Sequence, residues 1–262
     1  MKRIMTLAGI ILAFALCLAS CNGNVPKEYC EELVKLAEDG NPEAQDNLAA
    51  CYFRGEGVEQ NYEEAFKWFM KAAEQGNASA QFNVGVCYKQ GLGVEQNYEE
   101  AFKWYMKSAK QGDAKAQATV GVCYEQGWGV EQDYEEAFKW IMKVAEQGYA
   151  DAQYTVGMMY MDGAEYVSKN PKEAFKWIMK SAEQGYAAAQ FSLGECYRDG
   201  IGTSEKPQEA FKWFKKAAEQ GNADAQSELS LCYTLGIGVE KDRDKANFWS
   251  SKLVEQALQN GY

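Results

Sequence analysis

The chain has 262 residues, and 27 Lys and Arg against 38 Asp and Glu give a formal net charge of −11. This balance argues against a nucleic-acid partner, whose binding needs a basic stripe. The sequence has no histidine and no Cys-x-x-Cys. The usual base of a Ser or Cys nucleophile is therefore missing, and we expect no catalytic residues, no metal site and no cofactor.

The first 20 residues have the pattern of an export signal. Lys2 and Arg3 form a positive start, and residues 4–18 form an apolar stretch that is too short for a stable membrane span. Leu-Ala-Ser-Cys at 18–21 resembles the bacterial lipobox, which implies cleavage before Cys21 and lipid attachment to Cys21. An ordinary secretory signal with an incidental Cys21 is the alternative. The prediction is an exported lipoprotein anchored to a membrane of the bacterial envelope, on its periplasmic or surface face, with residues 21–28 as a tether.

From residue 40 onward one pattern recurs every 36 residues, with one step of 37. Ala-Phe-Lys-Trp stands at 65–68, 101–104, 137–140, 174–177 and 210–213, and a changed copy follows at 246–249. A fixed period of this length indicates stacked supersecondary units that bury their apolar faces on one another. The predicted repeats are residues 40–75, 76–111, 112–147, 148–184, 185–220 and 221–262.

Each repeat has the signals of two helices joined by a glycine loop. In the first repeat, Asn41 and Pro42 start a helix, and the glycines at 55–57 supply the positive-φ positions that end it. Asn61 and Glu64 form a capping box for the second helix. These start and stop signals agree at every boundary, so the expected fold class is all-α.

The two ends of the repeat array differ from its middle. Residues 29–39 align with a second helix that has no first helix of its own, which predicts an N-terminal capping helix. In the last repeat, Ser250 and Ser251 replace apolar residues, and we expect a more polar face there. The fourth repeat has one extra residue in its loop near Gly163, which predicts a bulged loop that leaves the stack intact.

The repeated elements resemble the Sel1-like repeats, which are relatives of the tetratricopeptide repeats. These elements are Ala-Gln-x-x-(Val/Leu)-Gly-x-x-Tyr, Gly-x-Gly-Val-x-x-(Asn/Asp)-x-x-(Glu/Lys)-Ala-x-x-Trp and Ala-x-x-Gly. The second repeat shows them at Ala80-Gln81, Val84-Gly85, Tyr88, Gly91 to Val94, Asn97, Glu100-Ala101, Trp104 and Ala109 to Gly112. The resemblance implies an α-solenoid of about six helix-turn-helix repeats, wound as a right-handed superhelix, that binds other proteins.

Some Sel1-like proteins are described as binding or hydrolysing β-lactams. A serine β-lactamase needs Ser-x-x-Lys, with the serine at a helix start. No Ser-x-x-Lys occurs in this chain. Paired carboxylates such as Glu63 and Glu64 are adjacent in sequence and point to different helix faces. The chain is therefore not expected to be an enzyme.

Two residue series at fixed repeat positions are predicted to be core. Trp68 and its equivalents form an aromatic ladder at helical spacing. Five cysteines share one position, and equivalent positions on stacked helices lie about 8–10 Å apart, too far for a disulfide. They are expected to be buried thiols: Cys51, Cys87, Cys123, Cys196 and Cys232. A disulfide between Cys30 and Cys51 is the one pairing that remains an alternative.

Some positions of the first helices vary among otherwise uniform repeats. In the first repeat they are Glu43, Asp46, Asn47, Ala50 and Phe53, and they fall on one helical stripe. By the tetratricopeptide resemblance this variable stripe faces the concave groove. The alternative is that its rings pack against the adjacent repeat. The predicted partner-binding residues are Phe82, Val86, Lys89, Glu125, Tyr154, Met158, Met161, Phe191, Glu195 and Arg198.

These patterns predict a monomeric, lipid-anchored adaptor or scaffold that holds an envelope protein or peptide in its groove. An envelope protein of structural or regulatory type that engages cell wall or glycan is the alternative, with the aromatic rings stacked on sugars. A glycan site needs planar aromatics beside Asn, Asp or Gln. Met158 and Met161 favour a protein partner.

Overall fold

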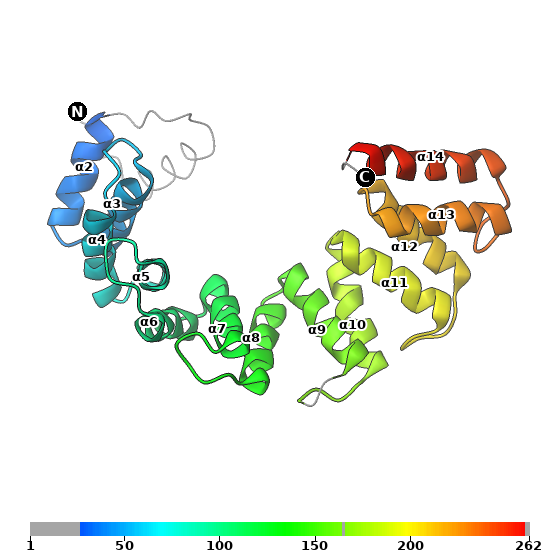
Figure 1. Cartoon of the computed structure of the whole chain (residues 1–262), viewed down its shortest axis with the longest axis horizontal. Helices are drawn as coiled ribbons and strands as arrows, with labels where there is room; N and C mark the ends of the chain where they lie inside the picture. Colours follow the sequence, from blue (N-terminus) through cyan, green and yellow to red (C-terminus); the bar gives the residue numbers. More distant parts are fainter. Residues whose placement is uncertain (1–26, 164–165, 260–262) are drawn as a thin grey trace, which may run out of the picture. The chain divides into compact units, whose positions relative to one another are not determined.

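The computed structural model describes residues 27–163 and 166–259, which form thirteen α-helices and no strand (Figure 1). The predicted signal segment 1–20, the lipidation site Cys21 and most of the tether 21–28 lie outside the described residues. The helices are α2 (Lys27–Glu38), α3 (Pro42–Arg54), α4 (Tyr62–Glu74), α5 (Ala78–Gln90), α6 (Tyr98–Lys110), α7 (Ala114–Gln126), α8 (Tyr134–Glu146), α9 (Ala150–Asp162), α10 (Pro171–Glu183), α11 (Ala187–Asp199), α12 (Pro207–Glu219), α13 (Ala223–Leu235) and α14 (Arg243–Gln259).

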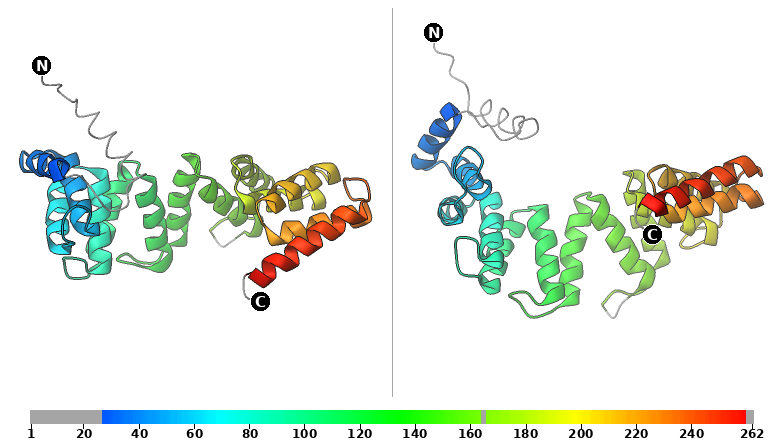
Figure 2. Two further views of the ribbon diagram at one scale, coloured as in Figure 1. Left: turned by 90° about the horizontal axis from the view of Figure 1, so that it is seen from above. Right: turned by 45° about the horizontal axis from the view of Figure 1, so that its top comes forward.

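The chain divides into two compact units, each of which is described by itself. The first ends at Gln132 and contains α2–α7, and the second begins at Asp133 and contains α8–α14. Within each unit, helices that follow one another along the chain pack together, as α5 and α6 do in the first unit and α13 and α14 in the second (Figure 2). The all-α fold of paired helices that the sequence predicts is confirmed.

Side-chain caps start the second helix of the early repeats where the sequence predicts them. Asn61 Oδ1 accepts a hydrogen bond from the backbone N–H of Glu64 at 3.1 Å. The other half of the predicted capping box is absent, because Glu64 Oε1 instead accepts from Lys67 Nζ at 2.7 Å and the Asn61 N–H donates to the carbonyl of Tyr52 at 2.9 Å. The same cap recurs at Asn97, Asp133 and Asn170.

The tryptophan ladder lies largely in the core. Trp104, Trp140, Trp177 and Trp249 are buried, and Trp68 and Trp213 are half-buried. Each indole is covered by the lysine three residues later, with 3.5–5.1 Å from the ammonium nitrogen to the ring centroid. The preceding phenylalanines join neighbouring repeats, as Phe66 does in an edge-to-face contact with Tyr88 at 5.3 Å. Burial of such a ring contributes roughly 2–3 kcal/mol, so the ladder stabilises the stack.

A ring on the second helix of a repeat packs on a glycine of the first helix. A Cβ on Gly85 would lie 2.6 Å from the ring of Tyr105, and a Cβ on Gly194 would lie 2.5 Å from the ring of Phe214. Both rings are buried. These glycines therefore let the two helices approach until the ring fills the space between them.

The cysteine series is buried, as predicted. Burial raises the pKa of the Cys87 and Cys196 thiols to about 12 and that of Cys123 and Cys232 to about 11. These four thiols are not bridged, and they fill core space as small apolar groups. Cys51 is equally buried. The side chain of Cys30 lies outside the described residues, so the Cys30–Cys51 pair stays a prediction.

The two end helices differ in how they close the array. In α2, Leu33 and Ala37 are buried in a cluster with Leu48 and Cys51 of α3, as an N-terminal cap requires. In α14 the serines are present, yet Phe248, Val254 and Leu258 are 58%, 58% and 69% exposed. The exposed serines agree with the expected more polar face, and these three apolar side chains interrupt it.

The predicted bulge of the fourth repeat falls partly on residues 164–165, which the structure does not describe. On the far side of these residues, the ring of Tyr166 stacks on Tyr134 at 5.8 Å and Val167 is buried. Helices α9 and α10 on either side pack together. Their pairing is preserved, as the sequence predicts.

Candidate partner-binding site

The variable stripe lies on the first helix of every repeat. The predicted binding residues come from α5 (Phe82, Val86 and Lys89), α7 (Glu125), α9 (Tyr154, Met158 and Met161) and α11 (Phe191, Glu195 and Arg198). Glu125 is exposed and the other nine are half-buried. The stripe is thus a surface of partly packed side chains.

Hydrogen bonds between stripe positions join successive first helices. In the first unit, Asn83 Nδ2 of α5 donates to Asp46 Oδ1 of α3 at 3.1 Å. In the second unit, the hydroxyls of Tyr154 on α9 and Ser192 on α11 are 3.4 Å apart. Because such contacts link neighbouring helices, the stripe is a continuous surface along the joined helices of each unit.

In the first unit the stripe has an aromatic floor. The ring of Phe82 lies 5.4 Å from that of Tyr105 on the second helix of the same repeat. Lys89 Nζ lies 4.3 Å above the ring of Trp128, whose other neighbour is Tyr98 at 6.3 Å. Trp128, the tryptophan of a glycine loop, is consequently half-buried. Phe82 packs on a ring of its own repeat and stays half-buried on the stripe.

In the second unit the stripe combines rings and thioethers. Phe191 packs on Phe214 of its own repeat at 5.7 Å, and Tyr154 lies 5.4 Å from Tyr186, just before the next first helix. Met158 and Met161 pack against the buried cluster around Ile178, Leu193 and Cys196. Flexible thioethers at a half-buried surface adapt readily to a partner side chain.

Arg198 forms the most connected charged group on the stripe. Its guanidinium donates to both carboxylate oxygens of Asp199 at 2.8 Å and to Glu228 Oε1 of α13 at 2.8 Å. The hydrogen bond from Arg198 lowers the pKa of Asp199, whereas burial raises the pKa of Glu195 nearby. The bidentate pair with Asp199 orients the guanidinium, and the single hydrogen bond to Glu228 ties α11 to α13.

A glutamine ladder inside the stack was missed by the sequence analysis. Buried Gln45 donates to the carbonyl of Ala37 at 2.9 Å and accepts from Gln75 Nε2 at 2.7 Å. Each such pair holds a first helix between the two second helices that flank it. The signal was the glutamine at a fixed position of every copy. The arrangement recurs at Gln81 with Gln111, Gln153 with Gln184, and Gln190 with Gln220.

Residues 27–163 and 166–259 contain neither a candidate membrane-spanning helix nor a candidate metal site. No helix there is both long and apolar enough to cross a membrane. In the same ranges no cluster of three or more His, Cys, Asp or Glu side chains is placed to hold a metal ion.

Comparison with known proteins assigns the repeats. The family model for the Sel1 repeat matches six consecutive segments: residues 42–77, 78–113, 114–149, 150–186, 187–222 and 223–258. The chain is a Sel1 repeat protein. Each match begins two residues after the start predicted from the sequence. Sel1 repeat proteins are helical scaffolds that generally mediate protein–protein interaction and are typically not enzymes.

Solved structures of other Sel1 proteins are similar to this chain. The Escherichia coli protein c5321, described as a protective antigen of uropathogenic strains, is 36% identical with a TM-score of 0.80 over 95% of this chain and 54% of that one. A Sel1 repeat protein from Oxalobacter formigenes is 36% identical with a TM-score of 0.67 over 93% of this chain and 96% of that one. This chain therefore spans about half the length of the E. coli protein. No curated protein matches the chain significantly.

Proposed function

We propose that this Sel1 repeat protein is a lipid-anchored adaptor of the bacterial envelope that binds a partner protein along its variable stripe. The observation that carries the proposal is that the first-helix positions that vary among the repeats fall on one helical stripe, which forms a surface in each unit. Joined side chains such as Asp46 with Asn83 and Arg198 with Glu228 run along that surface. The packed Trp, Gly and Gln positions maintain the stack. The residues on the stripe do not have this role, and they differ from repeat to repeat.

The chemistry of the stripe favours a polypeptide partner. Its apolar members are half-buried rings and thioethers, and its charged members, Lys89, Glu125, Glu195 and Arg198, lie among them. Apolar anchors with a charged rim are typical of protein interfaces. The described protective-antigen role of the E. coli relative is compatible with an exported position for this chain.

Photo-crosslinking tests the stripe. We expect p-benzoylphenylalanine at Val86 or Met158 to give a discrete adduct of higher mass in intact cells, because a partner bound on the stripe would contact both positions. Both side chains are half-buried there. Matched control sites are Lys103 and Lys176 on second helices, whose side chains are 59% and 61% exposed. Equal adducts from control and stripe sites, or none from the stripe, would show that the partner binds elsewhere.

The anchor is tested at Cys21. Changing Cys21 to Ala is expected to remove the acyl chains and shift the protein out of the membrane fraction or stall its processing, because each buried methylene contributes about 0.8 kcal/mol to membrane affinity. Fractionation with metabolic labelling by a fatty-acid analogue measures both effects. A processed Cys21→Ala protein that still sediments with membranes contradicts the lipid anchor.

A further inference from the structure

The last repeat lacks the ring pair that the second and fifth repeats contain. In the fifth repeat, Phe191 of the stripe packs on Phe214, which in turn packs on Gly194. The second repeat builds the same arrangement from Phe82, Tyr105 and Gly85. Thirty-six residues after the fifth-repeat trio, the last repeat has a serine at each position: Ser227, Ser230 and Ser250.

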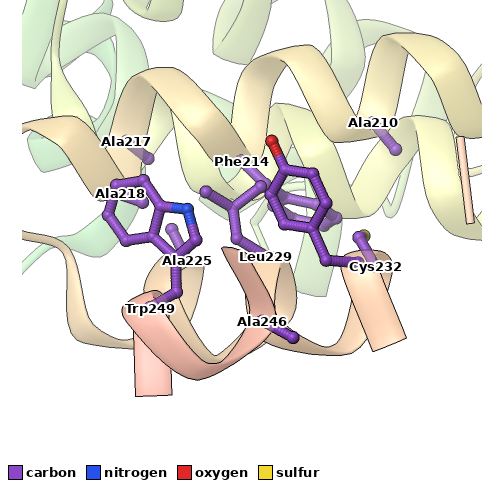
Figure 3. Close-up of a cluster of buried hydrophobic side chains, with 10 residues drawn as sticks. Ala210, Phe214, Ala217, Ala218, Ala225, Leu229, Cys232, Ala246 and Trp249 are labelled. Carbon is purple, nitrogen blue, oxygen red and sulfur yellow. The ribbon is translucent and has the colours of Figure 1, made fainter. Parts of the chain in front are cut away.

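These substitutions leave a recess between α13 and α14. It has a volume of about 400 Å³ and is lined by the three serines together with Leu231, Thr234, Leu253 and Val254. The two helices are nevertheless firmly packed, since Ala246 and Trp249 of α14 are buried with Leu229 and Cys232 of α13 (Figure 3). The recess is therefore a feature of a closed helix pair.

The lining of the recess suits an uncharged apolar group. Ser230 Oγ lies 2.8 Å from Ser250 Oγ and 3.0 Å from the carbonyl oxygen of Ala246, so these hydroxyls already have partners. The rim is apolar, because Leu231 is 46% exposed and Val254 is 58% exposed. No charged residue lines the recess. A polar end cap would show the opposite character.

The recess continues the variable stripe. Ser227, Leu231 and Thr234, which all line it, occupy the stripe positions of α13. The hydrogen bond between Arg198 and Glu228 joins this helix to the preceding stripe on α11. A polypeptide that follows the stripe of the second unit therefore arrives at the recess.

We propose that the recess receives an aromatic side chain of the bound partner, in place of the ring that the second and fifth repeats supply themselves. The inference rests on the proposed function, because it treats the stripe as the partner surface. An aromatic residue in a desolvated recess is the usual form of an energetic anchor at protein interfaces. The fifth repeat shows that such a ring fits between two helices of this geometry.

The test uses the full chain in detergent and blocked pentapeptides Gly-Gly-X-Gly-Gly, with X as Trp, Phe, Leu or Ala. Binding is followed by ¹⁹F NMR. The Trp and Phe peptides carry a fluorinated ring as the reporter, and the Leu and Ala peptides are added as competitors. We expect the aromatic peptides to bind at least about tenfold more tightly than the Ala peptide, as burial of a ring predicts. Equal binding of the Trp, Phe and Ala peptides overturns the proposal.

Two variants and a control locate the site. Ser230→Gly with Ser250→Phe rebuilds the contact between Gly194 and Phe214 of the fifth repeat, and is expected to fill the recess and abolish the aromatic preference. Leu231→Glu places a charge at the exposed rim and is expected to weaken aromatic binding at least about tenfold with little effect on folding. Ser251→Phe adds a ring to α14 outside the lining and should leave binding unchanged. Retained preference in either of the first two variants overturns the proposal.

Other outcomes separate this inference from the proposed function. If light scattering finds a dimer that Ser230→Gly with Ser250→Phe converts to a monomer, a second copy occupies the recess and the inference is wrong. If aromatic peptides bind the recess but stripe crosslinks fail, only the proposed function fails. If stripe crosslinks succeed without aromatic preference, only the recess assignment fails.

Discussion

Truncation of Trp104 to Ala is expected to destabilise the protein by about 3–5 kcal/mol, the range for removal of a buried aromatic ring. Trp104 is 8% exposed and belongs to a buried cluster with Ala80, Val84 and Cys87. Its loss opens a cavity in a buried cluster that also includes Ala49 and Phe69 of the first repeat, and the repeats depend on such shared cores for stability. The shift of the urea unfolding midpoint, with its slope, measures the effect.

Two companion variants identify the cause of this loss. Lys107→Met keeps the alkyl chain over the indole but removes the ammonium group, which lies 3.5 Å from the ring centroid, and should cost only about 0.5–1 kcal/mol. Phe82→Ala removes a half-buried stripe ring and should cost about 1–2 kcal/mol, between a surface and a core change. If Phe82→Ala is as damaging as Trp104→Ala, the stripe in this repeat is core and is not a binding surface.

The sequence predicted the local features of the repeats well. Many helix starts follow from side chains that act within three residues, as Asn61 does on Glu64, so reading residues in order is sufficient there. Helices α9, α11 and α12 begin without a side-chain cap. Lys67 has Glu63 four residues before it and Glu64 three residues before it, and it pairs with Glu64. Both spacings bring side chains together on a helix, and sequence spacing alone does not choose between them.

Features that depend on the stack were harder to predict. The bond between Gln75 and Gln45 spans 30 residues and exists only because one helix is placed beside another. The half-burial of the stripe has the same origin, since the rings beneath Phe82 and Phe191 come from the second helices. The recess of the last repeat required both kinds of information: the sequence shows three serines, and only the fold shows that they face one another.

Replacement of Gly93 by Ala is expected to destabilise the first unit by about 3 kcal/mol or more. Gly93 has φ of +71°, which costs an L-residue roughly 1–2 kcal/mol. A Cβ there would also overlap the carbonyl oxygen of Tyr62 at the start of α4 and would lie 2.8 Å from the backbone nitrogen of Glu63. The loop of one repeat rests directly on the preceding repeat at this point, so relief of the overlap requires the two repeats to move apart.

Gly91 in the same loop is the matched control. Its φ is +70°, but the nearest atom to an added Cβ is Gln96 Cβ at 3.5 Å, which is ordinary contact. Gly91→Ala should therefore show the backbone cost alone, about 1–2 kcal/mol. The difference between the two urea midpoints isolates the contact between repeats, because the backbone conformations are the same. Equal losses for the two variants would mean that the stack adjusts freely at this loop, and that the second glycine does not set the spacing of the repeats.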